Sequence, residues 1–174
     1  MPKKIDNARE LLLREAKRLL NEEGYGKLTM RSVANACGLG VGTAYNYFPS
    51  KNTLVASVML EDWRYCLEKM RGCSSVGMER LSFVYTCLGE FLTAYQTLFC
   101  DEGAKASYNS SAADFHKPLR AQLAEVIFPV CEEKFLSEFL AESILRWIVE
   151  GVPFETLQPL FYKLINKNEG DISL

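Results

Sequence analysis

The stretch "LTMRSVANACGLGVGTAYNYFPSKNTL", residues 28–54, decides the fold of the N-terminal part of this chain. Thr29 can cap a short helix over 30–36, because its hydroxyl accepts a bond from a free backbone N–H. Gly38 supplies a sharp turn, since a residue without Cβ enters the φ > 0 region freely. A second short helix follows over about 41–47. With a supporting helix before it, the stretch predicts a helix-turn-helix.

The glycines of this stretch indicate contact with an anion. Gly40 and Gly42 stand at the start of the second short helix, where free N–H groups and the positive end of the helix dipole can face negative charge. A nucleotide-binding P-loop does not fit, because the sequence lacks GxxxxGK[ST] and the strand that precedes it. We therefore expect the anion to be a phosphate of DNA, met by the second helix.

Helical periodicity continues along the rest of the chain, and no segment shows the sustained two-residue alternation of a strand. Apolar residues at helical spacing predict helices over 6–23, 54–70, 78–99, 118–128, 131–149 and 154–167. Gly24 and Gly151 are expected to end helices, Pro118 to lie in a first turn, and Pro129 to break or kink the chain. Residues 100–114 are polar and small and indicate a loop. The predicted fold class is all-α.

Charge is unevenly distributed along the 174 residues, whose formal net charge is −2. Residues 1–52 hold nine Lys/Arg and five acidic residues. A basic N-terminal part on an acidic remainder is typical of a protein whose N-terminal part alone meets a polyanion, although chance asymmetry on solvated faces explains the same numbers. We predict a DNA-binding domain at residues 1–52, called the head, and a helical ligand-sensing and dimerisation domain at residues 53–174, called the body.

Several classes of protein are disfavoured. No apolar run approaches the roughly 20 residues of a membrane span, and no apolar segment follows the N-terminal lysines, so a cytoplasmic protein is expected. The six cysteines show no CxxC pair and are expected to be small buried thiols, with a thiol sensor as the alternative. His116 has no cysteine at ligand spacing, so we expect no metal and no cofactor.

Two other functions are weighed against DNA binding. A helical enzyme is disfavoured by the single histidine, the absence of Glu-x-x-His spacing and the absence of a nucleophile motif. A helix-turn-helix kept for protein partners stays open. Affinity for DNA that falls steeply with salt would separate a DNA-binding protein from such an interaction module.

Residues 28–54 resemble the tetracycline-repressor (TetR) family of bacterial regulators. The family pattern runs Thr-x-x-x-(Ile/Val)-Ala-x-x-Ala-Gly-(Val/Leu)-Ser-x-Gly-Thr-x-Tyr-x-(Tyr/His)-Phe-x-Ser-Lys-x-x-Leu. The matching residues here are Thr29, Val33, Ala34, Gly38, Leu39, Gly42, Thr43, Tyr45, Tyr47, Phe48, Ser50, Lys51 and Leu54. Gly40 stands where the family has Ser, and Cys37 replaces Ala. The resemblance covers about the first 55 residues and implies a ligand-responsive homodimeric repressor that binds two half-sites of a palindromic DNA operator.

The resemblance also implies roles for single residues of the head. Thr43 and Asn46 are expected to meet base edges, and Val41 a thymine methyl group. The remaining contacts are expected to go to the DNA backbone, with Thr29 either capping its helix alone or also touching phosphate, and Tyr45 either on DNA or partly in the core. The full expected DNA-binding set is Thr29, Arg31, Ser32, Val41, Gly42, Thr43, Tyr45, Asn46, Tyr47 and Lys51. The residues expected in the core are Leu39, Phe48 and Leu54.

The last two predicted helices are apolar over a wide face, which predicts an isologous four-helix dimer interface. The expected interface residues are Leu136, Phe139, Leu140, Trp147, Ile148, Leu157, Phe161 and Leu164. The alternative is that these helices close the core of the monomer.

A ligand pocket is expected inside the body, with the loop over 100–114 as its entrance. The candidate lining residues are Trp63, Tyr85, Phe91, Tyr95, Phe99, Tyr108, Phe115 and His116. Aromatic residues at helical spacing are more often plain core than pocket lining, so that alternative stays open. The expected effector is a small apolar or aromatic molecule.

Overall fold

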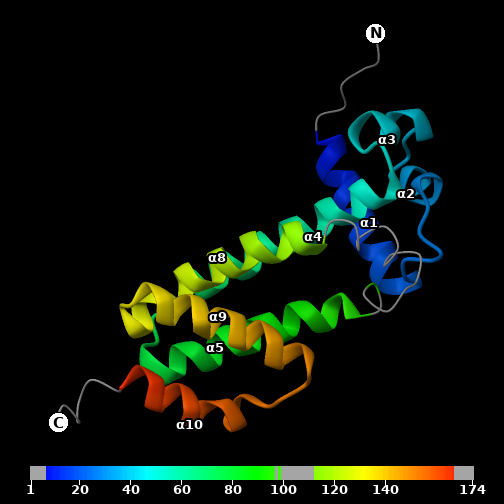
Figure 1. Cartoon of the computed structure of the whole chain (residues 1–174). Coiled ribbons are helices and arrows are strands. Elements are labelled where there is room, and N and C mark those ends of the chain that lie inside the picture. Colours follow the sequence, from blue (N-terminus) through cyan, green and yellow to red (C-terminus); the bar gives the residue numbers. More distant parts are fainter. Residues whose placement is uncertain (1–6, 97, 99–111, 167–174) are drawn as a thin grey trace, which may run out of the picture. The chain divides into compact units, whose positions relative to one another are not determined.

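The computed structural model describes residues 7–96, 98 and 112–166, without the side chains of 112–116. Every regular element within these ranges is an α-helix, which confirms the predicted all-α class (Figure 1). The helices are α1 (Ala8–Glu23), α2 (Met30–Ala36), α3 (Val41–Tyr47), α4 (Lys51–Arg71), α5 (Gly77–Ala94), α8 (Ala112–Cys131), α9 (Lys134–Val149) and α10 (Phe154–Ile165). No helix in the described ranges is both long and apolar enough to cross a bilayer.

The chain forms two compact units. The first contains residues up to Arg64 together with Thr93–Ser110, and the second contains Tyr65–Leu92 and the chain from Ser111 onward. Helix α4 contributes to both units, because its residues up to Arg64 belong to the first and the rest to the second.

In the first unit, α1 packs against α2 and α2 packs against α3. The apolar stripe of α1 is buried as its spacing predicts, and its members are Leu12, Leu13, Ala16, Leu19 and Leu20. Gly24 ends α1 at φ 80, and its N–H donates to the Leu20 carbonyl at 3.0 Å. The bounds of α2 and α3 agree with the expected ranges 30–36 and 41–47. The predicted helix-turn-helix is therefore confirmed.

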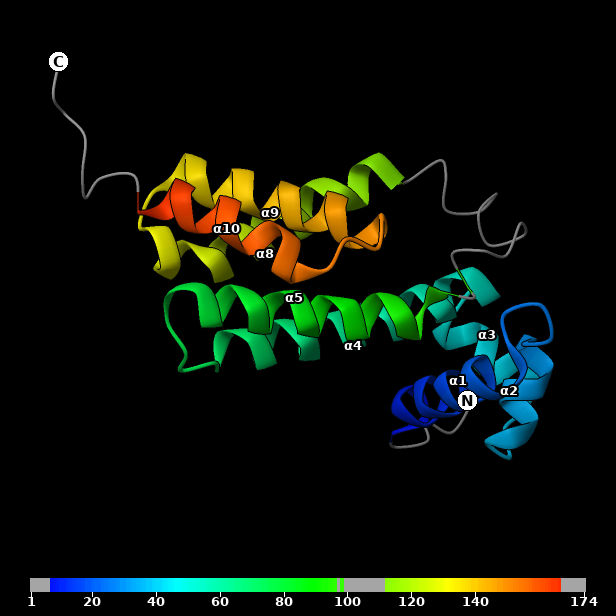
Figure 2. The same cartoon turned by 90° about the horizontal axis from the view of Figure 1, so that it is seen from below.

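In the second unit, α8 and α9 pack against each other (Figure 2). Helix α5 lies close to α9 and to the start of α10. Tyr85 donates to the Val152 carbonyl and its ring lies 5.5 Å from that of Phe154, which opens α10. A Cβ added to Gly89 would stand 3.6 Å from Ile148 of α9. The fully buried interior includes Leu81, Leu88, Leu123, Ile127, Leu140 and Ile144.

Arg80 is the buried charged residue of this second unit, at 9% exposure. Its Nε donates to the Val126 carbonyl of α8 at 3.1 Å, and its Nη1 donates to the Cys73 carbonyl just beyond α4 at 2.7 Å. Carbonyls near helix C-termini carry partial negative charge, so they compensate the guanidinium. Arg80 thereby joins three helices.

The prediction for Pro118 was wrong, and of the two alternatives for Pro129, a break or a kink, the break does not occur. Pro118 lies well inside α8 rather than in its first turn, and Pro129 lies inside the same helix rather than breaking it. Proline has no N–H to donate to the carbonyl four residues before it, so each of the two prolines leaves one bond within α8 unmade. The chain turns only after Cys131, where Glu132 adopts φ 51 and the Glu133 carboxylate accepts from the Phe135 N–H at 2.8 Å to begin α9.

Candidate nucleic-acid interface

One side of α3 is exposed, and the opposite side is held inside the first unit. Ala44 is 0% exposed and Phe48, one turn later, is 2% exposed. Gly42, Tyr45 and Asn46 recur at helical spacing on the exposed side, with Tyr45 at 49% exposure. A short helix anchored by one face and open on the other is the geometry that a recognition helix needs.

The turn before α3 is fixed by backbone geometry. Gly38 adopts φ 65, its N–H donates to the Asn35 carbonyl at 3.0 Å, and the Leu39 N–H donates to the Ala34 carbonyl at 2.9 Å. These bonds satisfy carbonyls at the end of α2, as a left-handed glycine cap does. Leu39 is half-buried rather than deep in the core, because it covers the corner between the two helices.

Thr29 and Ser32 form a reciprocal cap at the start of α2. The Ser32 N–H donates to Thr29 Oγ1 at 3.0 Å, and the Thr29 N–H donates to Ser32 Oγ at 3.0 Å. This capping box satisfies two backbone donors that the helix leaves free. The capping role of Thr29 is therefore confirmed, and Ser32 serves the same cap.

Lys51, which the sequence predicted as a DNA contact, is half-buried. Its Nζ donates to the Tyr25 carbonyl at 2.9 Å and lies 3.8 Å from the centroid of the Tyr25 ring. The Tyr25 hydroxyl donates in turn to the Asn52 amide oxygen. The ammonium thus ties the chain after α1 to the first turn of α4, because a carbonyl and an aromatic face both attract a cation.

Arg9 of α1 contacts the residue that ends α3. Its guanidinium carbon lies 5.6 Å from the centroid of the Phe48 ring, and its Nη1 donates to Glu61 Oε1 of α4 at 3.0 Å. Sequence reasoning did not single out Arg9. The signal was a basic residue on the polar side of α1, which the sequence alone does not distinguish from a solvated charge.

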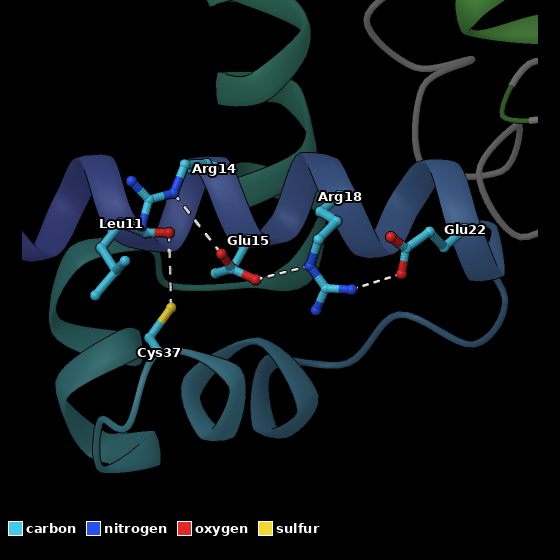
Figure 3. A network of polar contacts seen from close by, with 6 residues as sticks. All are labelled: Leu11, Arg14, Glu15, Arg18, Glu22 and Cys37. Atoms are coloured by element: carbon cyan, nitrogen blue, oxygen red, sulfur yellow. Dashed lines mark hydrogen bonds and ion pairs between the residues drawn. The ribbon is translucent and has the colours of Figure 1, made fainter.

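Several of the head's basic residues are paired with carboxylates rather than free for DNA. Figure 3 shows Arg14 and Arg18 of α1 on either side of Glu15, with Arg18 also reaching Glu22. Lys17 pairs with Asp62 at 2.6 Å. Among the described residues of the head, Lys27 and Arg31 are exposed cations for which the structure shows no ion pair. Both lie next to the N-terminus of α2, and Lys27 was not among the predicted DNA contacts.

The cysteines differ in burial. Cys66 and Cys87 are buried, and burial raises the pKa of the Cys66 thiol to about 11. Cys37 is half-buried in the turn after α2, where its thiol donates to the Leu11 carbonyl at 3.6 Å (Figure 3). Burial raises the pKa of Cys37, and the neighbouring Glu15 carboxylate raises it further. Raised pKa values disfavour the reactive thiolate.

In the described part of the chain, no group of three His, Cys, Asp or Glu side chains is placed to hold a metal ion.

The predicted pocket residues divide between the two units. Trp63 and Tyr95 are buried in the first, whereas Tyr85 and Phe91 belong to the second. Tyr85 is committed to packing against α10, as described above. Phe99 and Tyr108 lie outside the described residues, as do the side chains of Phe115 and His116 and the loop expected at 100–111. Residues 112–114, expected in that loop, begin α8 instead.

The predicted dimer residues also divide, by burial. Phe139 and Trp147 are exposed at 47% and 45%, and Leu136, Ile148 and Leu164 are half-buried. In contrast, Leu140, Leu157 and Phe161 lie in the interior of the chain itself, because they face the other helices of the second unit. Phe135 and Leu160, which the prediction left out, are exposed at 75% and 58%.

Comparison with known proteins gives the head a family. A model of bacterial regulatory proteins of the tetR family matches residues 12–58, which contain α2, α3 and their supporting helix. Residues 12–58 are a tetR-family domain.

The HTH-type transcriptional regulator UidR of Escherichia coli (strain K12) is 29% identical over 63 residues, which are 36% of this chain and 32% of that protein. YvdT of Bacillus subtilis (strain 168), an uncharacterised HTH-type transcriptional regulator, is 29% identical over 72 residues, 41% of this chain and 37% of its own. The matches thus span about a third of the length of these curated relatives.

The fold beyond the tetR-family domain is also that of solved regulators. Thermus thermophilus FadR, a TetR-family transcriptional repressor solved with lauroyl-CoA, aligns with a TM-score of 0.61 at 20% identity, over 95% of this chain and 97% of its own. The fatty acid degradation regulator FadR from Bacillus halodurans aligns with a TM-score of 0.56 at 18% identity, over 97% and 100%. An N-terminal helix-turn-helix followed by a helical C-terminal part is therefore the architecture of the whole chain.

Proposed function

We propose that this protein is a DNA-binding transcriptional regulator that acts as a homodimeric repressor and is released by a small ligand. The observation that carries the proposal is the exposed face of α3, where Gly42, Tyr45 and Asn46 stand on a helix anchored by buried Ala44 and Phe48. This face lies within a tetR-family domain. The head would bind DNA, and the body would dimerise and sense the ligand.

Each exposed group suits a particular part of DNA. The Asn46 amide can donate to and accept from an adenine edge, and Thr43 at the same helix suits a neighbouring base. Val41 suits a thymine methyl group, and the hydroxyls of Tyr45 and Tyr47 suit backbone phosphates. Gly42 leaves open space, since a Cβ built there would meet nothing within 4 Å, so the backbone can approach a strand closely.

Phosphate contact by cations is assigned to Lys27 and Arg31 first. Both are exposed beside α2, and the structure shows no carboxylate paired with either among the described residues. Lys51 would contribute only by leaving or sharing the Tyr25 carbonyl. The two recognition helices of a dimer would meet two half-sites, because one helix-turn-helix buries too little surface for a specific site.

The proposed effector is a small molecule with an apolar or aromatic part. Two structural neighbours support a small-molecule ligand in this fold, since one is FadR with lauroyl-CoA and the other is the multidrug binding protein EbrR with imidazole. Trp63 stays proposed as a pocket residue within the first unit, and Phe91 as one within the second. The coupling between ligand and DNA is tested by measuring the affinity for lauroyl-CoA with and without bound DNA. A ligand that weakens DNA binding by a given factor must itself bind more weakly to the DNA complex by the same factor.

The test of DNA recognition begins with recovery of bound fragments from genomic DNA of the host. Affinity for a recovered fragment and for unrelated DNA is then compared in Asn46→Ala and in Asn35→Ala, an exposed asparagine of α2 that serves as the matched control. Asn46→Ala should lose about 10-fold or more on the recovered fragment and little on unrelated DNA. Failure to recover any preferred fragment would favour the protein-interaction module instead.

A further inference from the structure

Two residues from separate parts of the chain meet at the carboxylate of Asp62 within the first unit. Lys17 Nζ of α1 donates to Asp62 Oδ1 at 2.6 Å, and the Tyr95 hydroxyl donates to Asp62 Oδ2 at 2.7 Å. Asp62 lies on α4, and Tyr95 follows the last residue of α5. Each carboxylate oxygen thus has its own donor, one charged and one neutral.

The three members of this cluster differ in how far they are buried. Tyr95 is 3% exposed and the Asp62 side chain is 25% exposed, whereas the Lys17 side chain is 50% exposed. The hydroxyl is therefore fixed by the interior, and the carboxylate is fixed by the hydroxyl. Lys17 is the most exposed member of the cluster. A hydrogen bond to a charged acceptor is among the stronger polar contacts in a protein.

We infer that Asp62 is a positioning residue through which the end of α5 controls α1, and thereby α2, which packs on α1, and α3, which packs on α2. With the Tyr95 hydroxyl in place, the carboxylate points at Lys17 and holds α1 against α4. When Tyr95 moves, the carboxylate is free to rotate into water, and the tie to α1 weakens. This inference rests on the proposed function, and it assigns to that function the contact by which events in the chain after α5 reach the head.

The neighbouring pair of Arg9 and Glu61 provides a control of the same kind. Arg9 Nη1 donates to Glu61 Oε1 at 3.0 Å, so this pair also joins α1 to α4, with side chains 51% and 44% exposed. The Tyr95 hydroxyl donates to Asp62, which is not a member of this pair. Loss of Glu61 should weaken the α1–α4 contact without changing how Tyr95 acts.

The experiment is a double-mutant cycle on affinity for a genomic fragment selected by the wild-type protein. Tyr95→Phe removes the hydroxyl alone, and it should weaken binding at least about fivefold in the wild type and equally in Glu61→Ala. In Asp62→Ala the same change should have no effect, because its acceptor is gone. A Tyr95→Phe effect of equal size in the Asp62→Ala background, or no effect in any background, would overturn the inference.

A second measurement separates control of α1 from simple destabilisation. Amide hydrogen exchange in Tyr95→Phe should become several-fold faster across the turn of α1 that carries Lys17, at a temperature where the protein is folded. Unchanged exchange there would overturn the inference even if affinity fell. If Asp62→Ala does not fold, Lys17→Met takes its place in the cycle. If the wild type binds no fragment in preference to unrelated DNA, the proposed function itself fails. If the wild type binds but Tyr95→Phe leaves its affinity unchanged, only the inference fails.

Discussion

At the scale of single residues, Gly42 is a place where stability and function should have opposite requirements. It lies inside α3 with nothing within 4 Å of the position of a Cβ. Gly42→Ala should therefore raise the free energy of unfolding by about 0.5–1 kcal/mol, because alanine loses less backbone entropy in a helix. The same methyl group should weaken DNA binding, since it would hold the backbone of α3 away from the strand.

Urea unfolding and DNA affinity of Gly42→Ala test both signs. Gly89→Ala is the control, because this glycine also lies within a helix and its Cβ would make an ordinary 3.6 Å contact with Ile148. The control should gain stability without losing DNA affinity. Equal DNA affinity in Gly42→Ala and the wild type would show that α3 does not approach DNA at this point.

Lys51 and Arg31 should separate structural from DNA-contacting cations. Lys51→Ala removes a bond to the Tyr25 carbonyl and a cation over the Tyr25 ring, so it should lower the free energy of unfolding by about 1–2 kcal/mol. Arg31→Ala should leave stability unchanged and weaken DNA binding. Denaturation midpoints of the two variants check this, and a Lys51→Ala midpoint equal to that of the wild type would contradict the structural role.

Cys66 should be protected from alkylation. Burial raises its pKa to about 11 from 9.0, so the thiolate fraction at pH 8 falls about 100-fold. Peptide mapping after iodoacetamide treatment at pH 8 should find Cys66 unmodified in the folded protein and modified in urea. Folding favours the neutral thiol. The contribution of Cys66 to the free energy of unfolding is therefore fully present below pH 9 and is lost as the pH rises from 9 to about 11. Rapid labelling of folded protein would contradict this environment.

At the scale of elements, the sequence predicted α1, α2 and α3 closely because each carries its own local signals. Thr29 caps α2, Gly38 turns the chain, and the apolar stripe of α1 has one period throughout. The bounds of α8 were not predictable from such signals, because tertiary packing overrides the local preference of Pro118 and Pro129. The start of α4 at Lys51 could have been found from Ser50, whose hydroxyl accepts from the Thr53 N–H at 3.1 Å.

The sequence also predicted which positions of α3 are exposed better than it predicted which cations are free. Ala44 and Phe48 fix the orientation of α3, and the helical period then places Asn46 outside. The partners of Arg9, Lys17 and Lys51 come from α4 or from the chain after α1, which are distant in sequence. Charge counting cannot show such pairings.

The α9–α10 surface should hold the dimer through its exposed residues alone. Phe139→Glu and Trp147→Glu place a charge on an exposed apolar surface, so they should yield folded monomers with normal helical content. Phe161→Glu should instead unfold the protein, because Phe161 is 3% exposed. Light scattering and circular dichroism separate the two results.

Tyr65→Glu is the control for this surface, since Tyr65 is 70% exposed and belongs to α4 rather than to either of the last two helices. It should remain dimeric. An intact dimer in both Phe139→Glu and Trp147→Glu would remove α9 from the proposed interface.

At the scale of the whole molecule, the charge distribution supports the proposal that the tetR-family head and the helical C-terminal part have different roles. The basic residues left unpaired in the described head, Lys27 and Arg31, lie at the N-terminus of α2. The C-terminal part keeps its acidic balance. This arrangement favours approach of DNA to the head alone.

The central claim, that this head binds DNA, is tested most directly by the salt dependence of affinity for a selected genomic fragment. Lys27 and Arg31 from each of two protomers would neutralise about four phosphates, so log affinity should fall against log salt with a slope of about −3.6. Arg31→Ala should reduce the slope to about −1.8, because it removes one contact from each protomer. A slope near zero in the wild type, or one that Arg31→Ala leaves unchanged, would contradict the account.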